Sequence, residues 1–120
     1  MKRGHRDLRV WQESIVLVEM IYRFTDTFPK SEQFGLTSQM RRASVSVPAN
    51  VSEGCARNGT KELLHFLGIA SGSLSELDTL IEISARLGLG NDTEPIKAKI
   101  DEVSALLLAL AKSLRQRTGP

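Results

Sequence analysis

The chain has 120 residues, of which 41% are apolar, 25% charged and 5% aromatic, values ordinary for one water-soluble globular domain. Its single cysteine excludes an internal disulfide framework, and it contains no apolar run of the roughly 18–20 residues that a membrane-spanning helix needs. We therefore expect one domain, residues 1–120, that works in the cytoplasm and contacts no membrane.

The first predicted helix covers residues 7–28. Its apolar residues recur at spacings of three and four along two separate lines, which indicates contacts on more than one side of the helix. The first line is Leu8, Trp11, Ile15, Val18 and Tyr22, and the second is Leu17, Ile21, Phe24 and Phe28. The polar segment that begins at Pro29 ends this helix.

The second predicted helix runs from about residue 36 to residue 54. Its apolar line is Leu36, Met40, Ala43, Val47 and Val51. Pro48 stands in the middle, where it lacks an N–H group and its ring clashes with the carbonyl of Ser44. We expect a bent helix there, followed by a turn at the glycine-rich segment "EGCARNGT".

The third and fourth predicted helices are bounded by capping residues. Thr60 is expected to cap the start of the third, and Gly88 or Gly90 to end it in the left-handed conformation. Asp92 or Thr93 is expected to cap the fourth. The apolar line of the fourth helix is heptad-like: Ile96, Ile100, Val103, Leu107, Leu110 and Leu114.

Four long helices joined by short connections predict an all-α fold, an antiparallel up-down-up-down four-helix bundle. This connectivity brings both chain ends and the turn between the second and third helices to one end of the bundle. Residues 1–9 carry a net charge of +3 and residues 112–120 carry +3, although the whole chain carries only +2. The prediction is a basic pole: Lys2, Arg3, Arg6, Arg9, Arg57, Lys61, Lys112, Arg115 and Arg117.

Binding to a nucleic-acid backbone requires Lys and Arg side chains gathered on one surface. Basic chain ends, however, are often only solvated. The sequence contains no recognition-helix signature, and no aromatic platform for stacking single-stranded bases is evident.

Polar residues form a line along the second helix at spacings of three and four. They are Gln39, Arg42, Ser46, Asn50, Glu53 and Arg57. Pairing across the following turn places Asn50 opposite Gly68, and Ser46 opposite Gly72. Two glycines four residues apart let helix backbones approach closely. We expect a polar seam closed by an ion pair between Arg42 and Glu76; the alternative is a solvated helix face.

Three segments resemble one protein family: "DLRVWQESIVLV", "FGLTSQMRRASVSVPANVSEG" and "FLGIASGSLSELDTLIEIS". The family is that of bacterial four-helix-bundle proteins encoded within intervening sequences of large-subunit ribosomal RNA genes. It is related to the accessory variability determinant of diversity-generating retroelements. The matching positions are Gln39, Arg42, Ser46, Pro48, Asn50, Glu53, Gly54, Gly72, Ser73 and Glu76.

The resemblance implies a four-helix bundle that assembles into a ring-like homopentamer. For the retroelement relative it also implies a basic surface that binds RNA or DNA, and a reverse transcriptase partner. It assigns no catalytic role to any matching position, and it does not imply that this chain works with a retroelement.

Enzymatic chemistry has little support in the sequence. Cys55 and His65 flank one turn and are the only nucleophile–base pair to consider, but neither an orienting carboxylate nor an oxyanion donor set accompanies them. One cysteine and two histidines do not form a recognisable metal-binding pattern, and "GIASGS" lies within a helix, where it cannot cradle a phosphate. We expect no catalytic residues, no metal and no cofactor.

Two classes of function remain. The first is a non-enzymatic nucleic-acid-binding or ribonucleoprotein accessory protein that uses the basic pole. The second is a structural or protein-interaction oligomer that binds no nucleic acid.

Overall fold

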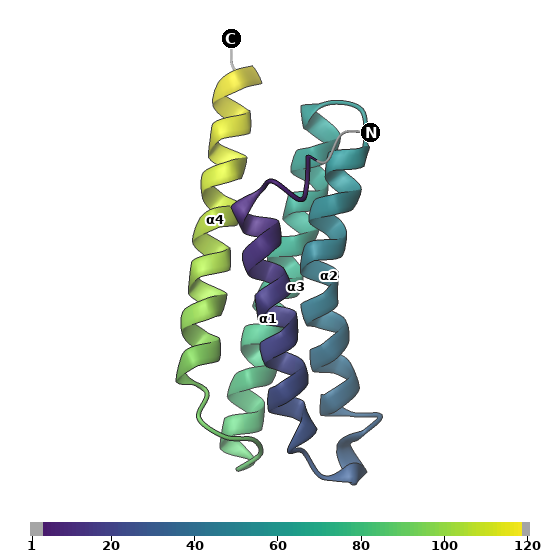
Figure 1. Cartoon of the computed structure of the whole chain (residues 1–120), viewed down its shortest axis with the longest axis vertical. Coiled ribbons are helices and arrows are strands. Elements are labelled where there is room, and N and C mark those ends of the chain that lie inside the picture. Colours follow the sequence, from purple (N-terminus) through teal and green to yellow (C-terminus); the bar gives the residue numbers. More distant parts are fainter. Residues whose placement is uncertain (1–3, 119–120) are drawn as a thin grey trace.

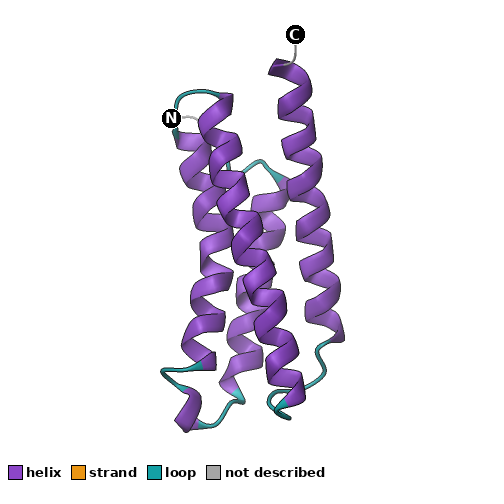
Figure 2. Ribbon diagram, turned by 180° about the vertical axis from the view of Figure 1, so that it is seen from behind, coloured by secondary structure: helices purple, strands orange, loops and turns teal. Residues whose placement is uncertain are grey.

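Four α-helices and one short 3₁₀-helix make up the part of the chain that the structure, a computed structural model, describes: residues 4–118. The elements are α1 (Arg9–Asp26), η1 (Lys30–Glu32), α2 (Leu36–Ala56), α3 (Thr60–Arg86) and α4 (Glu94–Thr118). These residues include no strand, as Figure 2 shows from behind. The predicted all-α fold with four helices is confirmed.

The helices lie side by side in a rod of about 51 × 25 × 19 Å. Figure 1 shows consecutive helices running in alternating directions along the long axis. α1 and α3 each pack against both α2 and α4, and the closest association is between α2 and α3. The turn between α2 and α3 and the end of α4 lie at the same end of the rod (Figure 1).

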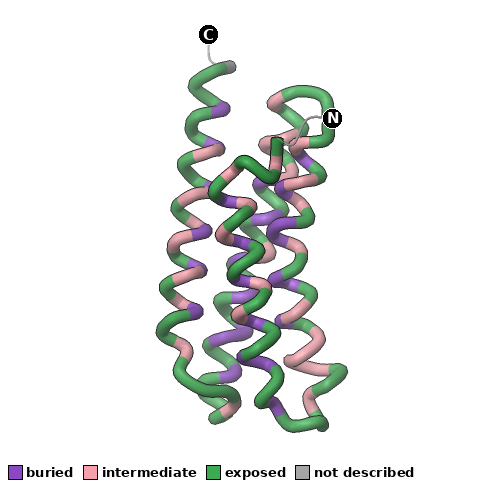
Figure 3. Tube along the Cα trace, in the orientation of Figure 1, coloured by how far each residue is buried: buried purple, intermediate pink, exposed green. Residues whose placement is uncertain are grey.

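The core contains most of the apolar lines that the sequence predicts, and Figure 3 shows buried residues recurring along the four helices. In α4, the predicted heptad positions are buried except for Leu110, which is partly buried. In α1 the two lines differ, because Leu17 and Ile21 are fully buried whereas Ile15 and Tyr22 are exposed. The second line of α1 therefore builds the core, and part of the first line faces outward.

The helix ends show which capping predictions hold. α3 begins at Thr60, but its N-cap is Gly59 at φ 96°, so the prediction that Thr60 caps it is wrong. At the other end of α3, Gly88 adopts φ 73°, and the N–H of Leu89 donates to the carbonyl of Ser84 at 2.9 Å. This is the Schellman arrangement that a glycine after a helix favours. Asp92 accepts the Glu94 N–H at 3.0 Å and caps α4, as predicted.

α2 continues as one helix through Pro48, which is buried. Near its end, Gly54 lies against α3 so closely that a Cβ at this position would be 2.9 Å from Leu63 Cδ1 and 2.9 Å from Phe66 Cβ. The absence of a side chain at Gly54 therefore permits the close α2–α3 contact.

An ionic network joins α1 to α4. Lys99 Nζ donates to Glu13 Oε1 at 2.6 Å and to Glu102 Oε1 at 2.9 Å, and Arg9 pairs with Glu102 at 3.2 Å. The hydrogen bond from Lys99 lowers the pKa of Glu13, and the hydrogen bonds to Glu13 and Glu102 raise the pKa of Lys99.

These shifts predict how the stability of the network depends on pH. A lowered carboxyl pKa stabilises the fold above the ordinary value of 4.5, and this contribution is lost as the pH falls through the folded-state pKa. Glu13→Gln should therefore lower the melting temperature at pH 7, and the difference from wild type should shrink towards pH 3. Glu19→Gln is the control, because Glu19 forms only an exposed pair with Arg23 at 3.9 Å. A difference between wild type and Glu13→Gln that is equal at both pH values would contradict the network.

Candidate functional site

The predicted basic pole is distributed over one end of the rod. Lys2 and Arg3 lie outside the described residues. The remaining members lie before or at the start of α1, around the α2–α3 turn and in the last turns of α4: Arg6, Arg9, Arg57, Lys61, Lys112, Arg115 and Arg117. Figure 1 shows these segments at the same end of the molecule.

Several of these cations already have partners within the chain. Arg9 pairs with Glu102, and Arg57 pairs with Glu53 at 3.7 Å while its guanidinium lies over the Phe66 ring. Arg6 lies over the Trp11 ring at 5.3 Å. The carboxylates paired with Arg9 and Arg57 leave the pole less positive than a count of its cations suggests.

Three members of the basic pole are exposed and have neither an ion pair nor a ring contact with another described residue, unlike Arg6, which has the ring contact. They are Lys61, Lys112 and Arg117. These three cations are the best placed to contact an anionic ligand.

The predicted polar seam between α2 and α3 exists around Ser46. The hydroxyls of Ser46 and Ser73 share a hydrogen bond at 2.8 Å. Asn50 Nδ2 donates to the Ser46 carbonyl at 2.8 Å and to the Ser46 hydroxyl at 2.9 Å. The polar groups in the middle of this line are therefore hydrogen-bonded rather than simply solvated, whereas Gln39 and Glu53 are exposed.

Two other predictions about the seam are wrong. Gly68 and Gly72 are exposed, and a Cβ at either position would meet nothing within 4 Å, so they do not line a close α2–α3 contact. Arg42 and Glu76 are both exposed and form no ion pair with each other. The seam is thus short, and Gly54 is the glycine that lets the two helices approach.

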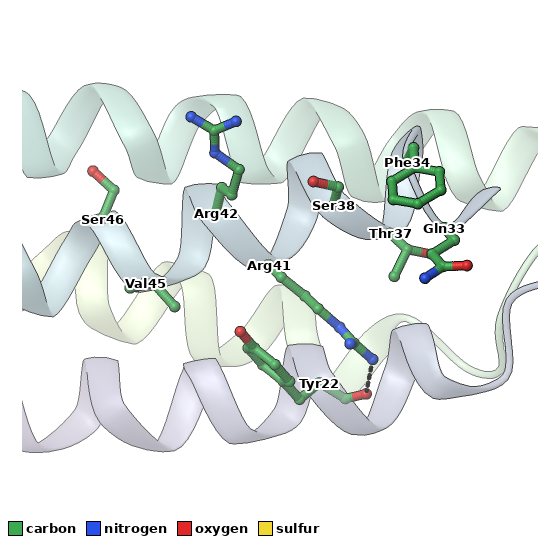
Figure 4. Close-up of a pocket in the computed structure, with 9 residues that line it drawn as sticks. All are labelled: Tyr22, Gln33, Phe34, Thr37, Ser38, Arg41, Arg42, Val45 and Ser46. Carbon is green, nitrogen blue, oxygen red and sulfur yellow. Dashed lines mark hydrogen bonds between the residues drawn. The ribbon is translucent and has the colours of Figure 1, made fainter.

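A groove with a volume of about 640 Å³ lies at the other end of the rod, where the connection between α1 and α2 meets both helices. Figure 4 shows the residues that line it: Tyr22, Gln33, Phe34, Thr37, Ser38, Arg41, Arg42, Val45 and Ser46. This lining contains two aromatic rings and two arginines, and it contains no carboxylate.

The two arginines leave α2 in opposite directions (Figure 4). Arg41 points towards α1, where its Nε donates to Thr25 Oγ1 at 2.9 Å and its guanidinium lies 4.5 Å from the centre of the Tyr22 ring. A weaker contact of 3.4 Å joins it to Asp26. Arg41 therefore connects α1 and α2 through non-covalent contacts, which the sequence analysis missed.

Arg42 points towards α3 and forms no ion pair with another residue of the described chain. It also lines a neighbouring hollow of about 480 Å³, together with Phe34, Ser73 and Glu76. Phe34 is 89% exposed, more than any other large apolar residue that the structure describes. Phe34 and Arg42 therefore border both hollows and remain free to contact a ligand.

The candidate chemistry at Cys55 and His65 does not come together. Cys55 is half-buried, and burial raises the pKa of its thiol, which is the opposite of what activates a nucleophile. His65 is exposed and lies against the ring of Phe66. Residues 4–118 hold no group of three or more potential metal ligands, and none of their helices is long and apolar enough to cross a membrane.

Comparison with known proteins identifies the family. The chain resembles a crystal structure of a protein of unknown function from the S23 ribosomal protein family of Bacteroides thetaiotaomicron. The TM-score is 0.75 at 22% sequence identity, over 86% of this chain and 95% of that one, which shows a shared fold. No curated protein matches the sequence. The sequence pattern described as "23S rRNA-intervening sequence protein" matches residues 6–109. As the resemblance predicted, the chain belongs to the 23S rRNA-intervening sequence protein family.

Proposed function

We propose that this chain is a non-enzymatic, nucleic-acid-binding accessory protein that acts in the cytoplasm, and that its basic pole contacts phosphates. The observation that carries the proposal is the position of the start of α1, the α2–α3 turn and the end of α4 at one end of the rod (Figure 1). This arrangement gathers Lys61, Lys112 and Arg117, which are exposed and form no ion pair with another described residue. The family's association with ribosomal RNA genes supports the same assignment.

We extend the proposal to assembly. Several apolar side chains are exposed on the single chain: Ile15, Val16, Tyr22, Phe34, Val45, Ile69, Ile83, Leu87 and Leu108. Burying such residues between copies would favour a homo-oligomer. The resemblance stated above implies five copies, and it implies a reverse transcriptase partner for the retroelement relative.

The proposal is tested by the salt dependence of RNA binding. The triple variant Lys61→Gln, Lys112→Gln and Arg117→Gln should weaken the binding of a fluorescein-labelled single-stranded RNA measured by anisotropy. If each cation contacts one phosphate, the slope of log K against log salt should fall by about 2, because each contact with a single strand contributes about 0.7.

The matched control removes three cations elsewhere on the chain. Arg23→Gln, Arg86→Gln and Lys97→Gln make the same change in net charge away from the basic pole. Equal losses in both triple variants would show a general charge effect and contradict the assignment to the pole. Absence of wild-type binding even at low salt would overturn the proposed function itself, because phosphate contacts are strongest there.

The second candidate function is a structural or interaction oligomer that binds no nucleic acid. It is favoured by the contacts that already occupy Arg9 and Arg57 and reduce the charge of the pole. In that case, light scattering would show an oligomer whose mass is unchanged by the three pole substitutions, and no RNA would bind.

A further inference from the structure

The groove at the α1–α2 end of the rod combines two kinds of recognition group. Phe34 presents an exposed aromatic face. Arg42 presents a guanidinium that forms no ion pair with another described residue. Gln33, Thr37 and Ser38 add hydrogen-bonding side chains to the lining. An aromatic face together with a cation and polar groups is the combination that binds a nucleobase and its phosphate.

We infer that this groove is a second contact site for single-stranded nucleic acid, in which Phe34 stacks on an unpaired base and Arg42 contacts an adjacent phosphate. The inference rests on the proposed function, because it assumes that the protein binds nucleic acid. It places a contact at the end of the rod opposite the basic pole, and it differs from the expectation that the chain lacks an aromatic stacking platform.

The charges around the groove favour an anion on the α3 side of α2. Arg41 is already engaged by Thr25, Tyr22 and Asp26. Arg42 points the other way and stands between the groove and the neighbouring hollow. Thr37 and Ser38 belong to the first turn of α2, but the Leu36 N–H at its start already donates to the Glu32 carboxylate at 3.1 Å, so Arg42 is the cation that would attract the anion. The phosphate is therefore expected beside Arg42, not beside Arg41.

Glu76 opposes this binding and provides an internal test. Its carboxylate is exposed and lines the neighbouring hollow together with Arg42, without an ion pair between them. A phosphate beside Arg42 would approach this carboxylate and be repelled by it. Removing the charge with Glu76→Gln should therefore tighten the binding of RNA.

The choice of a single strand follows from access to the base. In a duplex the bases are stacked on their neighbours, so Phe34 could not reach an aromatic face without unpairing the helix. An unstructured strand offers its bases for stacking on an aromatic side chain. Phe34 substitutions should thus weaken the binding of single strands and leave the binding of a duplex unchanged.

The experiment measures anisotropy of a fluorescein-labelled, unstructured RNA of about 12 nucleotides, within the usual site size for such proteins. Phe34→Ala should weaken binding by about 5- to 100-fold, and Phe34→Trp should retain it, because it keeps a flat aromatic face. Arg42→Gln should reduce the salt slope by about 0.7, corresponding to one phosphate contact. Arg86→Gln is the control of equal charge change, since Arg86 lies on α3 outside both hollows.

The outcomes separate this site from the basic pole. If Phe34→Ala and Arg42→Gln bind RNA like wild type while the triple pole variant loses binding, the groove is overturned and the proposed function stands. If Phe34→Ala changes the molar mass in light scattering and leaves RNA affinity unchanged, the groove is a contact between copies and the inference is wrong. Weaker binding in both groove variants, with Arg86→Gln unaffected, supports the site.

Discussion

Gly54→Ala is expected to lower the free energy of unfolding by about 1–2 kcal/mol. Overpacking a closely filled contact costs about 1–3 kcal/mol, and replacing glycine by alanine inside a helix returns up to about 1 kcal/mol. The added Cβ would be 2.9 Å from Phe66 Cβ and 3.4 Å from Leu63 Cα, atoms at or next to the α3 backbone, so rotating a side chain cannot relieve the contact. The change is measured by urea unfolding, with the loss of helix followed by circular dichroism at about 222 nm.

Gly72→Ala is the matched control, because it makes the same substitution within a helix where the added Cβ meets nothing within 4 Å. Here only the helix propensity changes, and the free energy of unfolding should rise by about 0.5–1 kcal/mol. The two variants should therefore shift stability in opposite directions. Stabilisation by Gly54→Ala would mean that α2 and α3 are not packed as closely as the structure shows.

The largest loss of stability is expected from Leu107→Ala. Leu107 is 3% exposed and belongs to the heptad line of α4, so truncating it leaves a cavity in the core. Leucine-to-alanine substitutions at buried positions cost about 2–5 kcal/mol. The loss is large compared with the total stability of about 5–15 kcal/mol that is usual for a domain. Urea unfolding again provides the measurement.

The neighbouring leucine provides the control. Leu108 is 64% exposed, so Leu108→Ala should change the free energy of unfolding by no more than about 0.5 kcal/mol in the single chain. If Leu108 is buried between copies, the same substitution will instead lower the molar mass found by light scattering. Equal losses of stability for Leu107→Ala and Leu108→Ala at a concentration where the protein is monomeric would contradict the orientation of α4.

The helices could be predicted from the sequence because their apolar periodicity is strong. The heptad line of α4 from Ile96 to Leu114 faces the core, and Gly88 ends α3 in the left-handed conformation. The predicted pairing of residues along the α2–α3 contact was correct to within one residue, since Ser46 contacts Ser73 rather than the predicted Gly72.

The rotation of α3 about its own axis could not be predicted in the same way. Successive helical residues point about 100° apart, so an error of one residue turns Gly72 away from α2 and brings Ser73 to the contact. The pairing rule counts residues along the axis and contains no information on rotation. This explains why the polar seam was found and its glycines were assigned wrongly.

The groove was missed because its residues come from separate parts of the chain. Tyr22 is the last residue of the first apolar line of α1, Phe34 lies in the α1–α2 connection, and Arg42 belongs to α2. Phe34 in the sequence looks like one more apolar residue, and only the fold shows that it is 89% exposed. A large apolar residue within a polar connection was the available signal.

The way the helices pack also determines the order in which the fold can assemble. Consecutive helices contact each other across short connections, so each helical hairpin closes only a short loop and can form rapidly. The α1–α4 contact is different, because it brings together the two ends of the chain. Its closure, aided by the pairing of Lys99 with Glu13, is expected to carry the largest loop-closure entropy of the helix contacts. If this contact separates when the native rod opens transiently, the start of α1 and the end of α4, which both contribute to the basic pole, move apart.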